Sequence, residues 1–149
     1  MVFAFLRKNQ FWGNPYPGLR CGEYNGYVGI TPDEPELLPS YMTSGVDLDQ
    51  EDYLDHHVSV YGGITFDCIC SGNFIPKDQL CEVPLTKIPD DLIGCRILGW
   101  DTSHIDSDPD MDKDWCTREN LAFMRKVVNY IEEVKKSEIM NLDLPFSND

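Results

Sequence analysis

The strongest constraint on the fold is a run of apolar residues at helical spacing between residues 118 and 136. Two adjacent stripes of a helix with 3.6 residues per turn are apolar: Leu121, Met124, Val128 and Ile131 on one, and Phe123, Val127, Tyr130 and Val134 on the other. Thr117 precedes the run and is a residue type that caps helix N-termini. An apolar face this wide needs a sheet to pack against. The sequence therefore predicts one C-terminal amphipathic helix that covers a sheet.

Proline and glycine are dense between Gly13 and Pro39, and they break any helix in that part of the chain. Short apolar runs predict strands, the clearest over residues 24–30, 57–66 and 93–100, with weaker ones over 2–6 and 81–85. We therefore expect an α+β fold, with an antiparallel or mixed sheet, long loops and the one C-terminal helix. The length of 149 residues suits a single globular domain over 1–136, followed by a tail over 137–149.

Acidic residues outnumber basic ones by 26 to 12, which gives a formal net charge of −14. A field of this sign repels nucleic-acid phosphates and anionic membranes, so we expect neither as a direct partner. No apolar run reaches the ~20 residues that span a bilayer. Arg7 and Lys8 follow the apolar residues 2–6, which is the wrong side for a signal peptide. We therefore expect a cytoplasmic protein in which the acidic stretch over 47–55 forms a solvated loop.

Six cysteines are present without an export signal, and this favours reduced thiols over disulfides. Cys68, Cys70, Cys81 and Cys95 could supply four thiolates to zinc, but the usual C-x-x-C spacing is missing. Ordinary buried cysteines are the favoured interpretation.

Asp101 and His104 are the first candidates for chemistry, because they follow the most apolar predicted strand and enter a polar loop. A carboxylate that accepts a hydrogen bond from imidazole fixes its tautomer and raises its basicity. Such a pair serves general-base catalysis, metal ligation or the recognition of a polar ligand. An Asp-x-x-His spacing is equally typical of a hydrogen bond that braces a loop, so both readings stay open.

Alternating acids after this loop match part of the register of a calcium-binding loop. The candidate calcium ligands are Asp108, Asp110, Asp112, Asp114 and Glu119. Against a calcium site, Lys113 stands where the tight turn requires glycine, and Pro109 stiffens the second position. A hydrated acidic loop is the favoured interpretation, and we expect no cofactor, with calcium as the alternative that this register leaves open.

Gly62, Gly63 and Thr65 could bring backbone N–H groups and a hydroxyl close to a polar ligand, since glycine has no side chain to keep the ligand away. A glycine pair that only kinks a strand is the commoner case. Aromatic residues that could line a stacking surface nearby are Tyr24, Tyr27, Tyr61 and Trp100, although such residues are more often core. If strands 57–66 and 93–100 pair, Asp101 and His104 should share one pocket with this segment.

Three segments in order resemble an uncharacterised family of small proteins common in bacteriophage and prophage genomes. The family motifs G-Y-V, V-H-G-G-L-T and G-F-D-x-x-H correspond to residues 26–28, 60–65 and 99–104, and the likeness covers about residues 22–136. Tyr61 replaces the family histidine, Trp100 replaces the phenylalanine, and Asp33-Glu34-Pro35 stands where the family tends to have His-Pro. The resemblance implies a phage or mobile-element origin and a shared pocket around residues 62–65 and 101–104. It implies no biochemical activity.

Three function classes follow from these patterns. The first is a phage-type accessory protein that binds a small polar ligand or a host component, for example to counter host defence. The second is a small hydrolase that uses Asp101 and His104, with or without a metal. The third is an acidic mimic of nucleic acid that blocks a DNA- or RNA-binding protein. Signatures of the common enzyme superfamilies, such as G-x-S-x-G and G-x-x-x-x-G-K, are missing from the sequence, and the first class is favoured.

Overall fold

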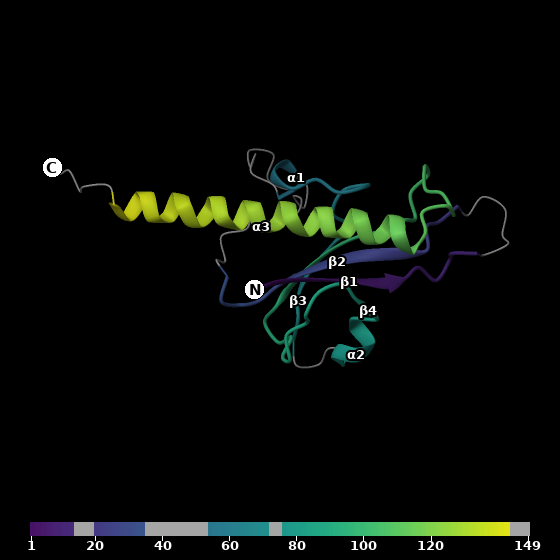
Figure 1. The fold of residues 1–149 in the computed structure, drawn as a ribbon, viewed down its shortest axis with the longest axis horizontal. Coiled ribbons are helices and arrows are strands. Elements are labelled where there is room, and N and C mark those ends of the chain that lie inside the picture. Colours follow the sequence, from purple (N-terminus) through teal and green to yellow (C-terminus); the bar gives the residue numbers. More distant parts are fainter. Residues whose placement is uncertain (14–19, 35–53, 72–75, 144–149) are drawn as a thin grey trace, which may run out of the picture.

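The computed structural model describes residues 1–13, 20–34, 54–71 and 76–143 of the chain. It is an α+β fold, as the sequence predicts, with a five-stranded antiparallel sheet and a long C-terminal helix (Figure 1). Most of the acidic stretch over 47–55 lies outside the described residues. No helix of the described part is both long and apolar enough to cross a membrane.

The sheet has the strand order β3-β5-β2-β1-β4. Its strands are β1 (Val2–Lys8), β2 (Tyr24–Ile30), β3 (Phe66–Ile69), β4 (Val83–Pro84) and β5 (Arg96–Trp100). The predicted strand over 24–30 is confirmed at both ends, and β5 begins later than residue 93. Gly94 explains the late start, because its φ of +81° makes a turn that an extended strand does not contain.

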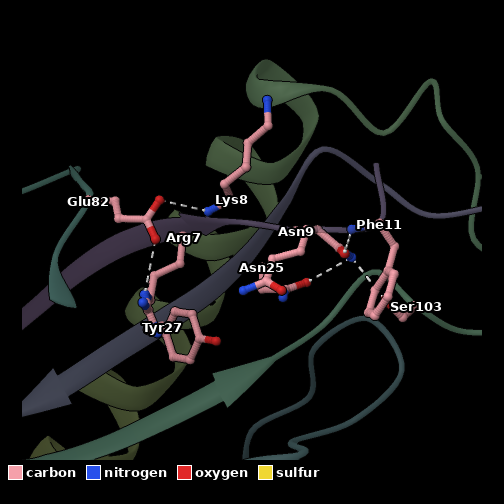
Figure 2. Close-up of a pocket in the computed structure, with 9 residues that line it drawn as sticks. Arg7, Lys8, Asn9, Phe11, Asn25, Tyr27, Glu82 and Ser103 are labelled. Atoms are coloured by element: carbon pink, nitrogen blue, oxygen red, sulfur yellow. Dashed lines mark hydrogen bonds and ion pairs between the residues drawn. The ribbon is translucent and has the colours of Figure 1, made fainter. Parts of the chain in front are cut away.

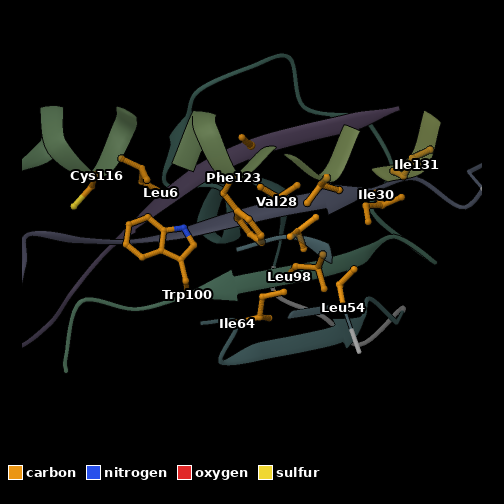
Figure 3. Packing of buried hydrophobic residues seen from close by; sticks show 13 residues of the cluster. Leu6, Val28, Ile30, Leu54, Ile64, Leu98, Trp100, Cys116, Phe123 and Ile131 are labelled. Atoms are coloured by element: carbon orange, nitrogen blue, oxygen red, sulfur yellow. The ribbon is translucent and has the colours of Figure 1, made fainter. Parts of the chain in front are cut away.

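Alternate residues of each strand face opposite sides of the sheet, so the sheet carries a core on each face. On one face Val28 of β2 and Leu98 of β5 are fully buried, and they pack against the C-terminal helix around Phe123 (Figure 3). On the other face Phe3 and Phe5 of β1 lie in a second cluster. The short helix α2 (Lys77–Leu80) lies on this second side in Figure 1.

The C-terminal helix α3 (Lys113–Asp143) is longer at both ends than the sequence predicts. The prediction that Thr117 caps it is wrong. Asp112 caps it instead, since its Oδ1 accepts a hydrogen bond of 2.9 Å from the backbone N–H of Trp115. The helix also continues through residues 137–143, where we expected the tail to begin. Figure 1 shows its C-terminal part extending beyond the sheet.

A buried asparagine fixes α3 on the sheet. The side-chain amide of Asn120 donates hydrogen bonds to the backbone carbonyls of Phe5, at 3.1 Å, and Tyr27, at 3.0 Å. Its Oδ1 accepts one of 2.9 Å from the indole N–H of Trp100. Asn120 is completely buried, so these bonds satisfy polar groups that water does not reach.

The predicted strand over 57–66 is wrong for most of its length. Its first residue ends the short helix α1 (Leu54–His57), and the backbone N–H of Val58 donates to the Leu54 carbonyl at 2.9 Å. A turn follows, in which Gly62 and Gly63 have φ of +70° and +81°. Positive φ does not occur in a strand, so β3 begins only at Phe66.

Four of the cysteines belong to the second core. Cys70, Cys81 and Cys95 are buried there, and Cys68 packs against them. Burial raises the pKa of all four thiols, that of Cys81 to about 11, which keeps them protonated. Among the described residues no group of three or more histidine, cysteine or acidic side chains is placed to hold a metal ion. The cysteines therefore act as core side chains in this structure.

Candidate functional site

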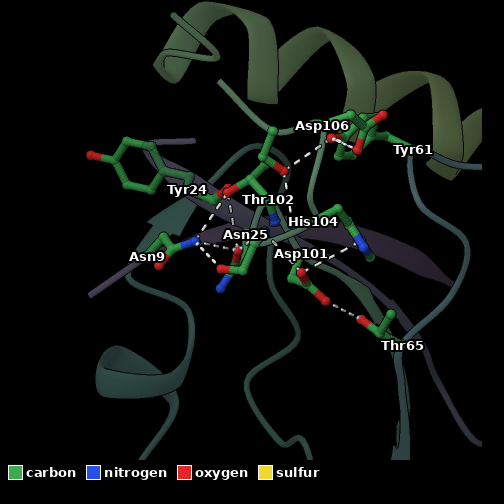
Figure 4. A network of polar contacts seen from close by, with 11 residues as sticks. Asn9, Tyr24, Asn25, Tyr61, Thr65, Asp101, Thr102, His104 and Asp106 are labelled. Carbon is green, nitrogen blue, oxygen red and sulfur yellow. Dashed lines mark hydrogen bonds and ion pairs between the residues drawn. The ribbon is translucent and has the colours of Figure 1, made fainter. Parts of the chain in front are cut away.

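The loop that follows β5 brings three of the predicted site residues together. Thr65 donates a hydrogen bond of 2.8 Å from its hydroxyl to Oδ2 of Asp101. The other carboxylate oxygen of Asp101 lies 3.5 Å from Nε2 of His104 and accepts a 2.9 Å bond from the backbone N–H of Ser103 (Figure 4). We call Thr65, Asp101 and His104 the polar cluster. It connects the segment before β3 to the loop after β5.

The glycine turn lies directly against the polar cluster. A Cβ added at Gly62 would overlap Nε2 and the neighbouring ring carbons of His104, so only glycine permits this approach. Nε2 is buried and makes no hydrogen bond within the described part, because its contact with Asp101 is an ion-pair distance only. Gly63 turns the chain back, and its N–H donates to the Val60 carbonyl at 2.9 Å. Asp101 therefore braces the loop through its bonds with Thr65 and the Ser103 N–H, and His104 contributes a close packing contact with Gly62.

The two aromatic residues predicted near the site have different environments. Tyr61 is half-buried, and its hydroxyl lies 2.9 Å from both Asp106 Oδ1 and Ser107 Oγ. Burial, together with the hydrogen bond to Asp106, raises the pKa of Tyr61, while the bond with Ser107 lowers it. Trp100 is only 1% exposed and lies in the main core. The prediction that Trp100 offers a stacking surface to a ligand is therefore corrected.

The five predicted calcium ligands do not share a centre. Asp108 pairs with Arg20 at 2.7 Å, and Asp112 caps α3. Glu119 Oε1 accepts a hydrogen bond of 2.9 Å from the backbone N–H of Tyr61. Asp110 and Asp114 are exposed to solvent. The loop uses its carboxylates to hold backbone and cationic groups, and the described residues assemble no metal-binding group here.

A network of neutral side chains extends from the same loop to β1 and β2. The side-chain amide of Asn9 donates to Ser103 Oγ at 2.9 Å, to Thr102 Oγ1 at 3.2 Å and to Asn25 Oδ1 at 3.4 Å. Asn25 Oδ1 also accepts the backbone N–H of Thr102 at 3.0 Å. Because a backbone N–H requires an oxygen as its partner, this bond fixes which way the Asn25 amide points. The network thus holds these side chains in one arrangement.

This network forms one wall of a pocket of about 290 Å³ (Figure 2). Its lining comes from the end of β1 and the residues after it, from β2, from the residue before β4 and from the loop after β5: Arg7, Lys8, Asn9, Gln10, Phe11, Asn25, Tyr27, Glu82 and Ser103. Asp101 and His104 are not part of this lining, although Ser103 lies between them in the sequence. The polar cluster therefore supports the loop that carries one wall of the pocket.

One cation and one anion face each other in the lining. Arg7 Nε lies 3.3 Å from Glu82 Oε1, and both side chains are about one third exposed. The Lys8 ammonium points away from the pocket, where it pairs with Glu23 at 3.3 Å and lies over the ring of Trp12 (Figure 2). Burial raises the pKa of Tyr27, and the positive charge of Arg7 opposes that shift. Tyr27 therefore carries its proton at neutral pH and offers an O–H donor.

The sequence reasoning named Tyr27 only as a stacking residue and missed the rest of this lining. A usable signal was the charge distribution, because residues 1–20 contain Arg7, Lys8 and Arg20 but no acid, in a chain that is otherwise strongly acidic. The asparagines gave no such signal. Their partners come from distant parts of the chain, and only the strand pairing brings them together.

Comparisons with protein families, with curated proteins and with solved structures found no match.

Proposed function

We propose that the protein is a binding module that takes one small polar ligand into the pocket between β1, β2 and the loop after β5. The observation that supports this proposal is the pocket of about 290 Å³ with the hydrogen-bonded network in its wall. A volume of this size accommodates a small molecule, not a peptide or a second domain.

The wall is organised before a ligand arrives. Asn9 is 3% exposed, and both its amide hydrogens and its carbonyl oxygen are used within the network. Asn25 and Ser103 are held by Asn9 and by the backbone of the loop, so they lose little conformational freedom on binding. Thr65, Asp101 and His104 hold the base of the same loop, which gives the polar cluster a supporting role in this proposal.

The test is a fragment screen by two-dimensional amide NMR with small polar compounds. We expect hits that shift the amide signals of Asn25 and Ser103. Ser103→Tyr, which fills the pocket from an exposed position, should abolish these shifts. Ser71→Tyr is the matched control, because Ser71 is also exposed but lies outside the pocket lining, and it should bind as the parent does. A screen without any hit at these residues contradicts the proposal.

The contact between Asp101 and His104 supports a second candidate, a small hydrolase. In that role Nδ1 of His104 would accept a proton from water, because Nε2 faces Asp101. This candidate predicts turnover of simple ester or amide substrates that is lost in His104→Gln. Ligand binding in the pocket without such turnover favours the binding module.

We also propose the biological setting. The three ordered motifs around residues 26–28, 60–65 and 99–104 support an accessory protein of phage or prophage origin that acts in the cytoplasm of a bacterial host. In this setting the ligand is either a host metabolite or a group presented by a host protein, and its capture would serve to counter host defence.

A further inference from the structure

The hydrogen-bond acceptors and the hydrogen-bond donors that line the pocket differ in how many of them already have a partner. Several acceptors have a neighbour: Glu82 Oε1 lies at an ion-pair distance of 3.3 Å from Arg7 Nε, and Glu82 Oε2 accepts the backbone N–H of Lys8 at 3.2 Å. Asn9 Oδ1 accepts the N–H of Phe11 at 3.0 Å. Asn25 Oδ1 accepts from Asn9 and Thr102.

The donors are not engaged to the same degree. Within the described part, the terminal N–H groups of Arg7, the amide nitrogen of Asn25 and the hydroxyl of Tyr27 donate to no residue. Ser103 Oγ accepts from Asn9, and its own hydrogen is not donated to any described group. Figure 2 shows Arg7 beside Tyr27, with the Tyr27 hydroxyl directed into the space below Asn25. These donors come from β1, β2 and the loop after β5, and all four residues line the same pocket.

We propose that the ligand presents a carboxylate to this donor set. The inference rests on the proposed function and adds the chemical class of the ligand. A carboxylate carries two oxygens with about four lone-pair sites, and its planar geometry matches the fork of N–H groups on a guanidinium. Arg7 pairs with one oxygen or both, and the Tyr27 hydroxyl and the Asn25 amide, which lie nearest to it in Figure 2, complete the set, whereas Ser103 lies at the opposite end of the pocket. The rings of Phe11 and Tyr27 line the same pocket and provide apolar surface for the body of a small organic acid.

The net charge of −14 opposes the binding of a carboxylate at most places on the protein. Most of the surface repels an anion, so an anionic ligand binds only where a local cation and aligned donors offset the overall field. Arg7 supplies that cation inside the pocket, because the Lys8 ammonium is directed to Glu23 and Trp12. Glu82 reduces the local positive potential, but its Oε1 lies near Nε, and the terminal nitrogens of Arg7 pair with no acid in the described part of the chain.

The experiment compares two probes of nearly equal shape, sodium benzoate and benzamide, on the full chain. Amide NMR titrations report the Kd of each probe from the signals of Asn25 and Ser103. We expect benzoate to bind at least about tenfold more tightly than benzamide, because a charge-assisted bond to Arg7 is stronger than a neutral one. Arg7→Gln should remove this preference. Lys87→Gln removes one positive charge from an exposed position outside the lining, and it should keep the preference.

Tyr27→Phe is a second variant that deletes only a hydroxyl, and it should weaken benzoate binding about fivefold. Equal binding of benzoate and benzamide overturns the inference but leaves the pocket as a ligand site. A preference that survives in Arg7→Gln also overturns it. If neither probe shifts Asn25 or Ser103, the inference fails, and the fragment screen decides separately whether the pocket binds other polar molecules.

Discussion

Arg7 and Glu82 lie opposite each other because of the register of two strands. Leu6 of β1 pairs with Val83 of β4 in antiparallel fashion, so the next residue of β1 lies beside the residue that precedes β4. Side chains of directly opposed residues stand on the same face of a sheet. The separation of 3.3 Å between Arg7 Nε and Glu82 Oε1 follows from this pairing, which places the pair in the pocket lining.

Glu82→Gln tests what Glu82 contributes to ligand binding next to Arg7. The change removes a negative charge from the lining and keeps the side-chain shape, so we expect benzoate affinity to rise about threefold. Titration of the variant by amide NMR measures the change. A fall in affinity would mean that the larger effect of Glu82 is to orient Arg7. The Glu82 carboxylate would then be required for ligand binding.

Replacement of Asn120 by leucine should destabilise the fold by about 2–4 kcal/mol, since it leaves the buried Trp100 indole N–H without its partner and removes two further bonds to the carbonyls of Phe5 and Tyr27. Urea unfolding of the variant measures the free energy. Asn129→Leu is the matched control, because Asn129 is an exposed residue of the same helix and should change stability by less than about 0.5 kcal/mol. Equal effects of the two substitutions would show that the buried network contributes little.

Gly62→Ala should cost about 1–3 kcal/mol, for two separable reasons. Alanine is strained at a φ of +70°, and its Cβ would overlap His104. In the His104→Ala background the overlap is absent, so the same Gly62→Ala change should cost less there. Thermal unfolding of the four proteins in this double-mutant cycle gives the coupling. Strict additivity would contradict close packing of His104 on Gly62.

Glu34 gives the protein a predicted pH dependence. Hydrogen bonds from the Met1 amino group and from Lys135 of α3 hold the pKa of Glu34 below its ordinary value. A carboxylate whose pKa is lower in the folded state stabilises the fold at neutral pH, and this contribution is lost as the pH falls through the folded-state pKa. Glu34→Gln should therefore lower the Tm at pH 7 and should match the parent when the pH is well below about 4.

Glu138→Gln is the control for this effect, because Glu138 is an exposed acid on α3, the helix that carries Lys135. It should leave the Tm nearly unchanged across the same pH range. A constant Tm difference between Glu34→Gln and the parent at every pH would contradict the ion-pair explanation.

Local sequence patterns predicted strand β2 and helix α3. The short aromatic run over 24–30, bounded by glycine, and the apolar stripes of α3 were both recognised from the sequence. The exact buried stripe was harder to place. Val127 is fully buried whereas Val128 is only half-buried, because the sheet contacts a narrower face of α3 than the apolar residues mark.

Features that depend on tertiary contacts escaped the sequence reasoning. The segment 57–66 alternates like a strand, but the close approach of His104 to Gly62 requires a turn there. Thr65, Asp101 and His104 lie together, although most of segment 57–66 is not a strand; the pocket that we predicted they share with Gly62 and Gly63 stays a prediction. The roles of Asn9 and Asn25 in the pocket wall could not be predicted, because they depend on hydrogen bonds to a loop more than seventy residues away in the sequence.

The central claim is that the pocket beside Arg7 binds a small polar molecule, and a crystal structure of the protein with a hit from the fragment screen tests it most directly. The account predicts density for the compound between Arg7, Asn25, Tyr27 and Ser103, with an oxygen of the compound within hydrogen-bond distance of the Arg7 guanidinium. Density for the compound at another place on the surface, with this pocket filled only by water, would contradict the account.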